Sequence, residues 1–198
     1  KPESGMIKQA IKEYNIDPSQ SFLIGDKEND ILAAHKEGIN FSKKVYSVKL
    51  KERADITIVS SYPADIEFWQ AHKGLASGDL ANKEGGGIVL VTPCPEGISV
   101  THKGWGDLLS LDPEDIKSRI LRGEVEDYVA AGLALAVAIE RSRHKVCLVS
   151  DGLTYRDAEK LRFEKFKDIY EALSYLKRIY PEGKVNLLTH GGDTYPRS

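Results

Sequence analysis

Stretches in which apolar residues recur at helical spacing alternate along this chain with short, continuous apolar runs. Runs of four or five residues are typical of strands that are buried on both faces of a parallel sheet. Strands are predicted at residues 21–24, 45–48, 56–60, 88–91, 145–149 and 185–188. Helices are predicted at residues 6–14, 31–36, 66–82, 124–143, 158–161 and 168–180, with another beginning at Pro113 behind Asp112 as its N-cap.

This alternation favours one fold class: α/β, with a mostly parallel, Rossmann-like sheet that carries helices on both faces. In such folds the functional groups gather in loops just beyond the carboxyl ends of the strands. Those loops are residues 60–62, 92–97, 150–152 and 189–192, and each is rich in glycine, proline or small polar residues. The pattern predicts where a site lies and leaves its chemistry open.

The composition excludes several classes of protein. Lys and Arg total 28 against 30 Asp and Glu, so the net charge is only −2 and no basic field exists to attract nucleic acid or an anionic membrane. The chain is 41% apolar and 29% charged, which is enough to bury a core and argues against disorder. The longest apolar run, residues 129–139, is about half the roughly 20 residues that a bilayer requires, so it predicts a buried helix.

Cysteine use and the N-terminus point to a cytoplasmic protein. Cys94 and Cys147 lie far apart, with neither metal-binding nor redox spacing. No apolar export segment follows Lys1. Because Lys1 is not an initiator methionine, we expect the chain to be a piece of a longer protein.

Two aspartates, Asp26 and Asp30, lie four residues apart where a predicted strand gives way to a helix. Carboxylates in this arrangement can hold a hard cation such as Mg²⁺ through oxygen ligands. An ordinary turn whose side chains cap the helix explains them equally well. The spacing alone leaves both interpretations open.

Together with their surroundings, these aspartates resemble the last third of a haloacid dehalogenase superfamily phosphatase. The resemblance covers about 40 residues and rests on Lys1-Pro2, Gly5-Met6, Ile16-Asp17, Ile24-Gly25-Asp26, Asn29-Asp30-Ile31, Ala33-Ala34 and Gly38-Ile39. It implies that Lys1 neutralises a phosphate and that Asp26 and Asp30 hold Mg²⁺. The nucleophilic Asp-x-Asp-x-Thr stretch of those enzymes is missing from the sequence, so as it stands this segment is not a phosphatase.

A second candidate site is the pair Gln70 and Lys73, which are three residues apart and therefore share a face of a predicted helix. An ammonium supplies charge to a carboxylate or carbonyl oxygen, and an amide adds a directional hydrogen bond. The pair therefore suits a small hydroxy-acid anion. A solvated helix face is the competing interpretation, because Lys and Gln usually lie outside.

The surrounding motifs resemble the C-terminal domain of the lactate racemase family, the nickel-pincer 2-hydroxyacid racemases and epimerases. The match runs from about Ala33 to the end of the chain. Its motifs are Tyr46-Ser47-Val48, residues 54–61, Tyr62-Pro63, Trp69-Gln70-Ala71, Lys73-Gly74, Gly86-Gly87-Ile88, Cys94-Pro95-Glu96-Gly97, residues 144–150 and Gly191-Gly192. Residues 1–40 therefore have two candidate origins: a shortened racemase linker or a phosphatase tail.

The racemase resemblance implies that the cofactor chemistry and the orientation of the substrate belong to different domains. A nickel-pincer nucleotide attached to a lysine, together with histidine bases, carries the hydride chemistry in an N-terminal domain that this chain lacks. By resemblance, Lys73 steadies the substrate oxygen or carboxylate and Gln70 orients it. Trp69 is expected to wall the cofactor, although a core aromatic is an equal alternative. Tyr128 is a further, loosely aligned aromatic of the pocket. No metal ligand is assigned to this chain.

Three hypotheses follow. The leading one divides the chain into an N-terminal segment, residues 1–44, and a racemase C-terminal-like α/β domain, residues 45–198. This domain is inactive alone, and its partners are a small 2-hydroxy acid and the N-terminal racemase domain, with no role for nucleic acid or a membrane. The alternatives are a Mg²⁺-dependent phosphatase fragment and a plain interaction domain that retains the scaffold.

Overall fold

The computed structural model describes residues 5–17 and 28–198, which fall into two compact units, Lys1–Ser47 and Val48–Ser198. The first unit contains α1 (Gly5–Glu13) and α2 (Glu28–Tyr46). The predicted strand at 21–24, Lys1 and Asp26 lie outside the described residues, as does the side chain of Asp30 on α2.

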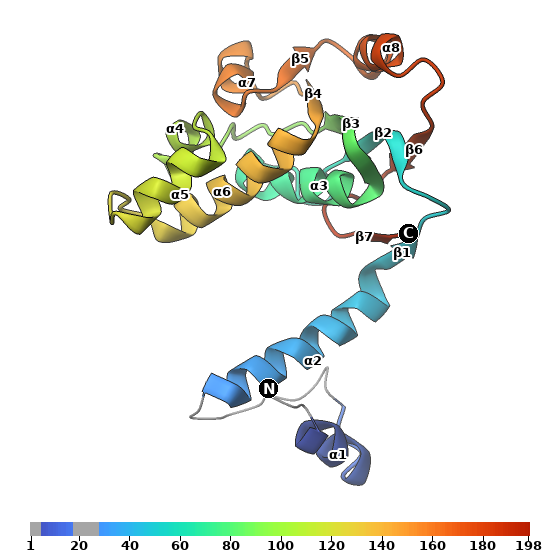
Figure 1. The fold of residues 1–198 in the computed structure, drawn as a ribbon, viewed down its shortest axis with the longest axis vertical. Helices are drawn as coiled ribbons and strands as arrows, with labels where there is room; N and C mark the ends of the chain where they lie inside the picture. The colour runs from blue at the N-terminus through green and yellow to red at the C-terminus, as the bar shows by residue number, and fades with distance from the viewer. Residues whose placement is uncertain (1–4, 18–27) are drawn as a thin grey trace. The chain divides into compact units, whose positions relative to one another are not determined.

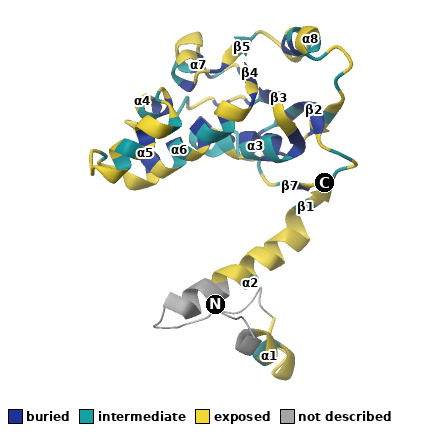
Figure 2. Cartoon of the chain, viewed as in Figure 1, coloured by how far each residue is buried: buried dark blue, intermediate teal, exposed yellow. Residues whose placement is uncertain are grey.

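Helix α2 corrects two sequence predictions. It continues past residue 36 to Tyr46, so the strand predicted at 45–48 is reduced to β1 (Ser47–Lys49). A glycine inside an exposed helix costs only about 1 kcal/mol, and the good helix formers around Gly38 outweigh that cost. Most residues of α2 whose burial is described are exposed, as the colouring of Figure 2 shows.

The second unit is built on a five-stranded sheet in the order β5-β4-β3-β2-β6, with every neighbouring pair parallel. Its strands are β2 (Ala54–Ser60), β3 (Asn82–Val91), β4 (Lys145–Val149), β5 (Glu164–Phe166) and β6 (Val185–Leu188). The predicted α/β, Rossmann-like class is confirmed.

Helices cover both faces of this sheet, as predicted (Figure 1). The helices α3 (Phe68–Ala81) and α6 (Tyr128–Arg143) pack on one face, and α8 (Ile169–Ile179) packs on the other. Alternate strand residues divide between the two cores because successive side chains of a strand point to opposite faces. Leu90 and Leu148 lie in the α3–α6 core, whereas Val89 and Cys147 lie beneath α8.

Several short elements were not predicted, or were predicted with other bounds. The structure adds α4 (Trp105–Leu109), β5 and β7 (Tyr195–Arg197), and it extends α7 to Tyr155–Leu161. Helix α5 (Pro113–Leu121) begins as predicted, but the Asp112 side chain makes no cap bond to it and pairs with Arg162 instead.

The strand order changes direction between β2 and β6, which is where such sheets usually bind a ligand. Here the loop after β6 fills that crevice: Gly191 N donates to Ser60 O at 2.8 Å, and Gly192 N donates to Tyr62 O at 3.1 Å. A Cβ on Gly191 would lie 2.3 Å from a methyl group of Val59, so this close approach requires glycine. The start of α3 lies at the same carboxyl edge, where it is hydrogen-bonded to the loop after β3.

Candidate functional site

The structure brings Gln70 and Lys73 together on the first two turns of α3, as their spacing predicted. Lys73 Nζ donates to Gln70 Oε1 at 2.7 Å. Gln70 is half-buried and Lys73 is exposed.

This bond determines what the pair offers to a ligand. Because the ammonium uses one lone pair of the Gln70 carbonyl oxygen, the amide NH₂ and the remaining ammonium hydrogens can still donate, while that oxygen keeps one lone pair as an acceptor. A surface on which donors outnumber acceptors, one of the donors being charged, is complementary to a carboxylate or hydroxy-acid oxygen. The chemistry that the sequence predicted is thus compatible with the geometry.

Main-chain hydrogen bonds fix the start of α3 in place. Phe68 N donates to Gly97 O and Trp69 N donates to Ile98 O, both at 2.9 Å. These bonds use the first helical N–H groups, so a bound anion would depend on the side chains of the pair rather than on the helix terminus. The preceding residue, Glu67, is buried and accepts from Val100 N at 2.7 Å.

Trp69 is held between two other rings. Its indole stacks on the imidazole of His102, with centroids 3.7 Å apart and planes 15° apart. Its edge-to-face contact with the fully buried Trp105 has centroids 4.8 Å apart. Trp69 is half-buried and packs against the core, so its core role is observed and its cofactor-wall role stays a prediction.

His102 connects Trp69 to the start of α6. Its Nδ1 lies 2.5 Å from Asp127 Oδ2, and the other oxygen of Asp127 caps α6 by accepting from Ala130 N at 2.9 Å. Two hydrogen bonds lower the pKa of Asp127. The larger effect comes from the Ala130 N–H and the next from His102, so the carboxyl group stays ionised. Tyr128, the predicted pocket aromatic, is the first residue of α6 and is 58% exposed.

Sequence reasoning missed the His102–Asp127 pair. The two residues are 25 positions apart, and only the fold brings the loop before α4 against the start of α6. The one available signal was an aspartate just ahead of the Ala-rich helix, which indicates an N-cap. That cap also explains why α6 begins at Tyr128 rather than at the predicted residue 124.

The two histidines near α3, His72 and His102, each use Nδ1 in a hydrogen bond. His72 Nδ1 donates to Trp69 O at 2.8 Å, and burial lowers the pKa of His72, so the ring stays neutral. Among residues 5–17 and 28–198, no group of three His, Cys, Asp or Glu side chains could hold a metal ion. The described side chains therefore do not fit the holding of a nickel cofactor.

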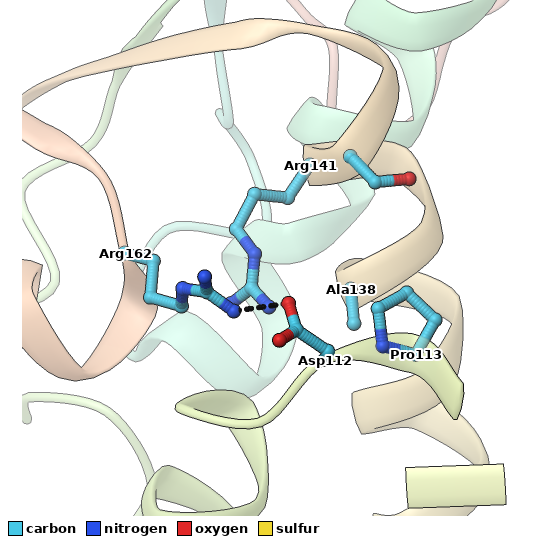
Figure 3. A pocket seen from close by; sticks show the side chains of 6 residues that line it. Asp112, Pro113, Ala138, Arg141 and Arg162 are labelled. Carbon is cyan, nitrogen blue, oxygen red and sulfur yellow. Dashed lines mark hydrogen bonds and ion pairs between the residues drawn. The ribbon is translucent and has the colours of Figure 1, made fainter. Parts of the chain in front are cut away.

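A cavity of about 220 Å³ lies elsewhere, beside α6, and includes none of the predicted site residues (Figure 3). Its floor is Arg141, which donates to the carbonyls of Leu109, Leu111 and Leu161. The lining residues are Asp112, Pro113, Ala138, Arg141, Ser142 and Arg162. The Arg141 guanidinium is largely occupied in tying the α4 end, the following turn and α7 to α6, which is a structural role.

A second histidine–aspartate pair joins the far ends of α3 and α6. His144 Nε2 lies 2.8 Å from Asp79 Oδ1, and Arg143 also contacts this carboxylate at 3.1 Å. The pKa of nearby Glu140 is raised to about 7, mainly by burial and to a smaller extent by the negative charge of Asp79. His144 Nδ1 and Glu140 Oε2 are buried without a hydrogen-bond partner.

Two family models match the chain in adjoining segments. A model described as lactate racemase C-terminal domain matches residues 49–191. A model described as HAD-hydrolase-like matches residues 1–42.

Comparison with known proteins gives the same two segments. The chain is 32% identical over 166 residues to a lactate racemase of Thermoanaerobacterium thermosaccharolyticum, covering 80% of this chain and 38% of that protein. It is also 40% identical over 65 residues to a D-glycero-β-D-manno-heptose-1,7-bisphosphate 7-phosphatase of Haemophilus ducreyi, covering 30% of this chain and 36% of that one.

The fold is similar to a solved structure, that of the lactate racemase apoprotein from Thermoanaerobacterium thermosaccharolyticum. The TM-score is 0.69 at 28% identity, over 97% of this chain and 48% of that one. The chain thus spans less than half the length of the racemases it matches. Among the described residues, no helix has the length and apolar character needed to cross a membrane.

Proposed function

Because this chain belongs to the lactate racemase C-terminal domain family, we propose that it supplies the substrate-orienting half of a nickel-pincer-dependent 2-hydroxyacid racemase. The observation that carries the proposal is the Lys73–Gln70 hydrogen bond at the start of α3, which brings an ammonium and an amide NH₂ together as donors for one ligand. The residues from about 45 onward form this half. The cofactor and the hydride transfer belong to an N-terminal racemase domain.

In this role the chain binds and orients the substrate. The Lys73 ammonium donates to the carboxylate or to the oxygen at C2 of the substrate, and the Gln70 amide donates a directional hydrogen bond to the same anion. A charged donor also stabilises negative charge that develops on an oxygen during reaction. Trp69 and Tyr128 flank the bound acid. The chain is inactive alone because it lacks the groups that move hydride and protons.

The test measures lactate binding to the whole chain, with the NMR signals of the Gln70 side-chain amide as the readout. Without its partner domain the chain should bind D- or L-lactate weakly, with a dissociation constant on the order of millimolar. We expect Lys73→Ala to weaken this binding at least tenfold, which corresponds to about 1.4 kcal/mol. Lys117→Ala, an exposed lysine on α5, is the matched control and should leave binding unchanged. Equal binding by wild type and Lys73→Ala would refute the assignment.

A second origin is favoured for the first segment alone, by the HAD-hydrolase-like match to residues 1–42. We propose that this segment is a phosphatase-derived piece without independent activity, since the sequence holds no Asp-x-Asp-x-Thr nucleophile. A generic phosphomonoester should therefore not be hydrolysed in the presence of Mg²⁺. Hydrolysis that disappears in Asp26→Asn would overturn this assignment.

A further inference from the structure

The plane of the Trp69 indole is set by groups outside its own helix. Trp69 is half-buried on α3, with the imidazole of His102 against its face and Trp105 against its edge. Trp105 is immobilised in the core, but His102 belongs to the loop before α4 and 25% of its side chain is exposed. His102 is therefore the less buried of the two rings that contact the indole.

Three bonds hold His102 in that position. Its backbone N donates to Ser99 Oγ at 3.1 Å, and its carbonyl accepts from Trp105 N at 3.0 Å. Its ring is fixed by Asp127 through Nδ1. Asp127 is itself rigid because its other oxygen caps α6. A chain of contacts thus runs from the start of α6, through His102, to the start of α3.

This chain of contacts ends beside the donor pair. Trp69 and Lys73 are four residues apart on α3, so their side chains lie on one helix face, one turn apart. A rotation of the indole would change the surface against which the ammonium and its ligand lie.

We propose that His102, fixed by Asp127, is a positioning residue that holds the Trp69 indole as a wall beside the Gln70–Lys73 pair. The proposal rests on the proposed function for its substrate and deepens it by adding a residue that acts through Trp69. The charged or titratable residues closest in sequence to these contacts are Lys103 in the loop of His102, His72 and Lys73 on α3, Asp107 on α4, and Glu126 and Tyr128 on either side of Asp127; Asp79 lies near the end of α3 and Glu140, Arg141 and Arg143 near the end of α6.

The first test measures the Trp69–Trp105 geometry without any ligand. Two indoles with centroids 4.8 Å apart and planes 76° apart should give an exciton couplet in the circular dichroism spectrum. Trp69→Phe should abolish the couplet, which establishes its origin. His102→Asn keeps a donor near Asp127 but removes the ring, so it should reduce the couplet by half or more. Lys103→Asn, the exposed neighbour, is the matched control and should leave the couplet intact.

A couplet of wild-type strength in folded His102→Asn would overturn the proposal. Where His102→Asn does not fold, NMR of the wild-type imidazole decides. The proposal requires the tautomer or cation that carries a proton on Nδ1, and Asp127→Asn should shift that proton's resonance while its amide oxygen still caps α6. An imidazole with a bare Nδ1 in the wild type would refute it.

Lactate binding separates this proposal from the function on which it rests. With the proposed function correct, His102→Asn should weaken lactate binding three- to tenfold and His102→Phe, which retains a ring, should weaken it less. If the wild type does not bind lactate, the proposed function fails, while the couplet and tautomer still decide whether His102 holds Trp69.

Discussion

The two ends of the α3–α6 layer carry the same pair of residue types in opposite surroundings. At the starts of the helices, His102 meets Asp127 with 25% and 44% of their side chains exposed. At the far ends, His144 meets Asp79 with 2% and 14% exposed. The open pair is linked to a half-exposed indole and a donor pair, whereas the closed pair is linked to a buried, partnerless carboxylate oxygen on Glu140.

Solvent access decides the use of a histidine–aspartate pair. Exposed ion pairs contribute little to stability, so the geometry of the open pair can serve another purpose at small cost. A buried pair is strongly destabilising to break because the surviving partner is left without compensation. We therefore expect stability to depend on the closed pair and the orientation of Trp69 to depend on the open pair.

The largest expected effect is at the closed pair. Asp79→Ala leaves His144 Nε2 and Arg143 without their shared carboxylate and should lower the free energy of unfolding by about 3 kcal/mol. Chemical denaturation followed by far-UV circular dichroism measures it. Asp193→Ala, at an exposed aspartate in the loop after β6, is the control and should change stability by less than about 0.5 kcal/mol. A cost at Asp79 equal to that control would remove the contrast between the two ends.

A pH-dependent effect is expected at Glu140, beside the closed pair. Its folded-state pKa, raised to about 7 from an ordinary 4.5, means that folding takes up a proton between these values. Stability from this group is therefore fully present below pH 4.5 and is lost as pH rises through 7. Glu140→Gln, which cannot ionise, should stabilise the chain by about 1–3 kcal/mol at alkaline pH and by almost nothing in acid. Urea midpoints across this range measure the effect, and a gain that does not vary with pH would contradict it.

The smallest expected effect is at the open pair. Asp127→Ala removes the N-cap of α6 and should cost about 1 kcal/mol, whereas Asp127→Asn retains a capping oxygen and should cost less than half of that. Thermal unfolding of the two variants side by side gives the difference. If Asp127→Asn costs as much as Asp127→Ala, the carboxylate's bond to His102 contributes more to stability than an exposed pair should.

The sheet was predictable because its strands are written into the sequence as continuous apolar runs. Strands β2, β4 and β6 match their predicted positions closely. The three-residue strand β5, Glu-Lys-Phe, carries no such run and gains its place only by pairing with β4. Short helices such as α4 were missed for the same reason, since one turn is too short to show a period.

The candidate site divides in the same way. The contact between Gln70 and Lys73 follows from helical spacing, so it could be predicted before the fold was known. The His102 contacts with Trp69 and Asp127 depend on tertiary packing between segments distant in sequence. Asp112 shows the converse, because a favourable N-cap position was overridden by an ion pair with Arg162.

One further consequence comes from the small sheet formed by β1 and β7. Leu50 N also donates to Arg197 O at 2.6 Å, so hydrogen bonds join the first and last strands of the unit from Val48 onward. Ends that meet in this way suit circular permutation. A short glycine-rich connection from Ser198 to Val48, with new termini opened in the exposed turn at residues 121–124, would leave every strand of the main sheet in its present order. The same geometry makes this unit a suitable insert for a surface loop of an unrelated host protein.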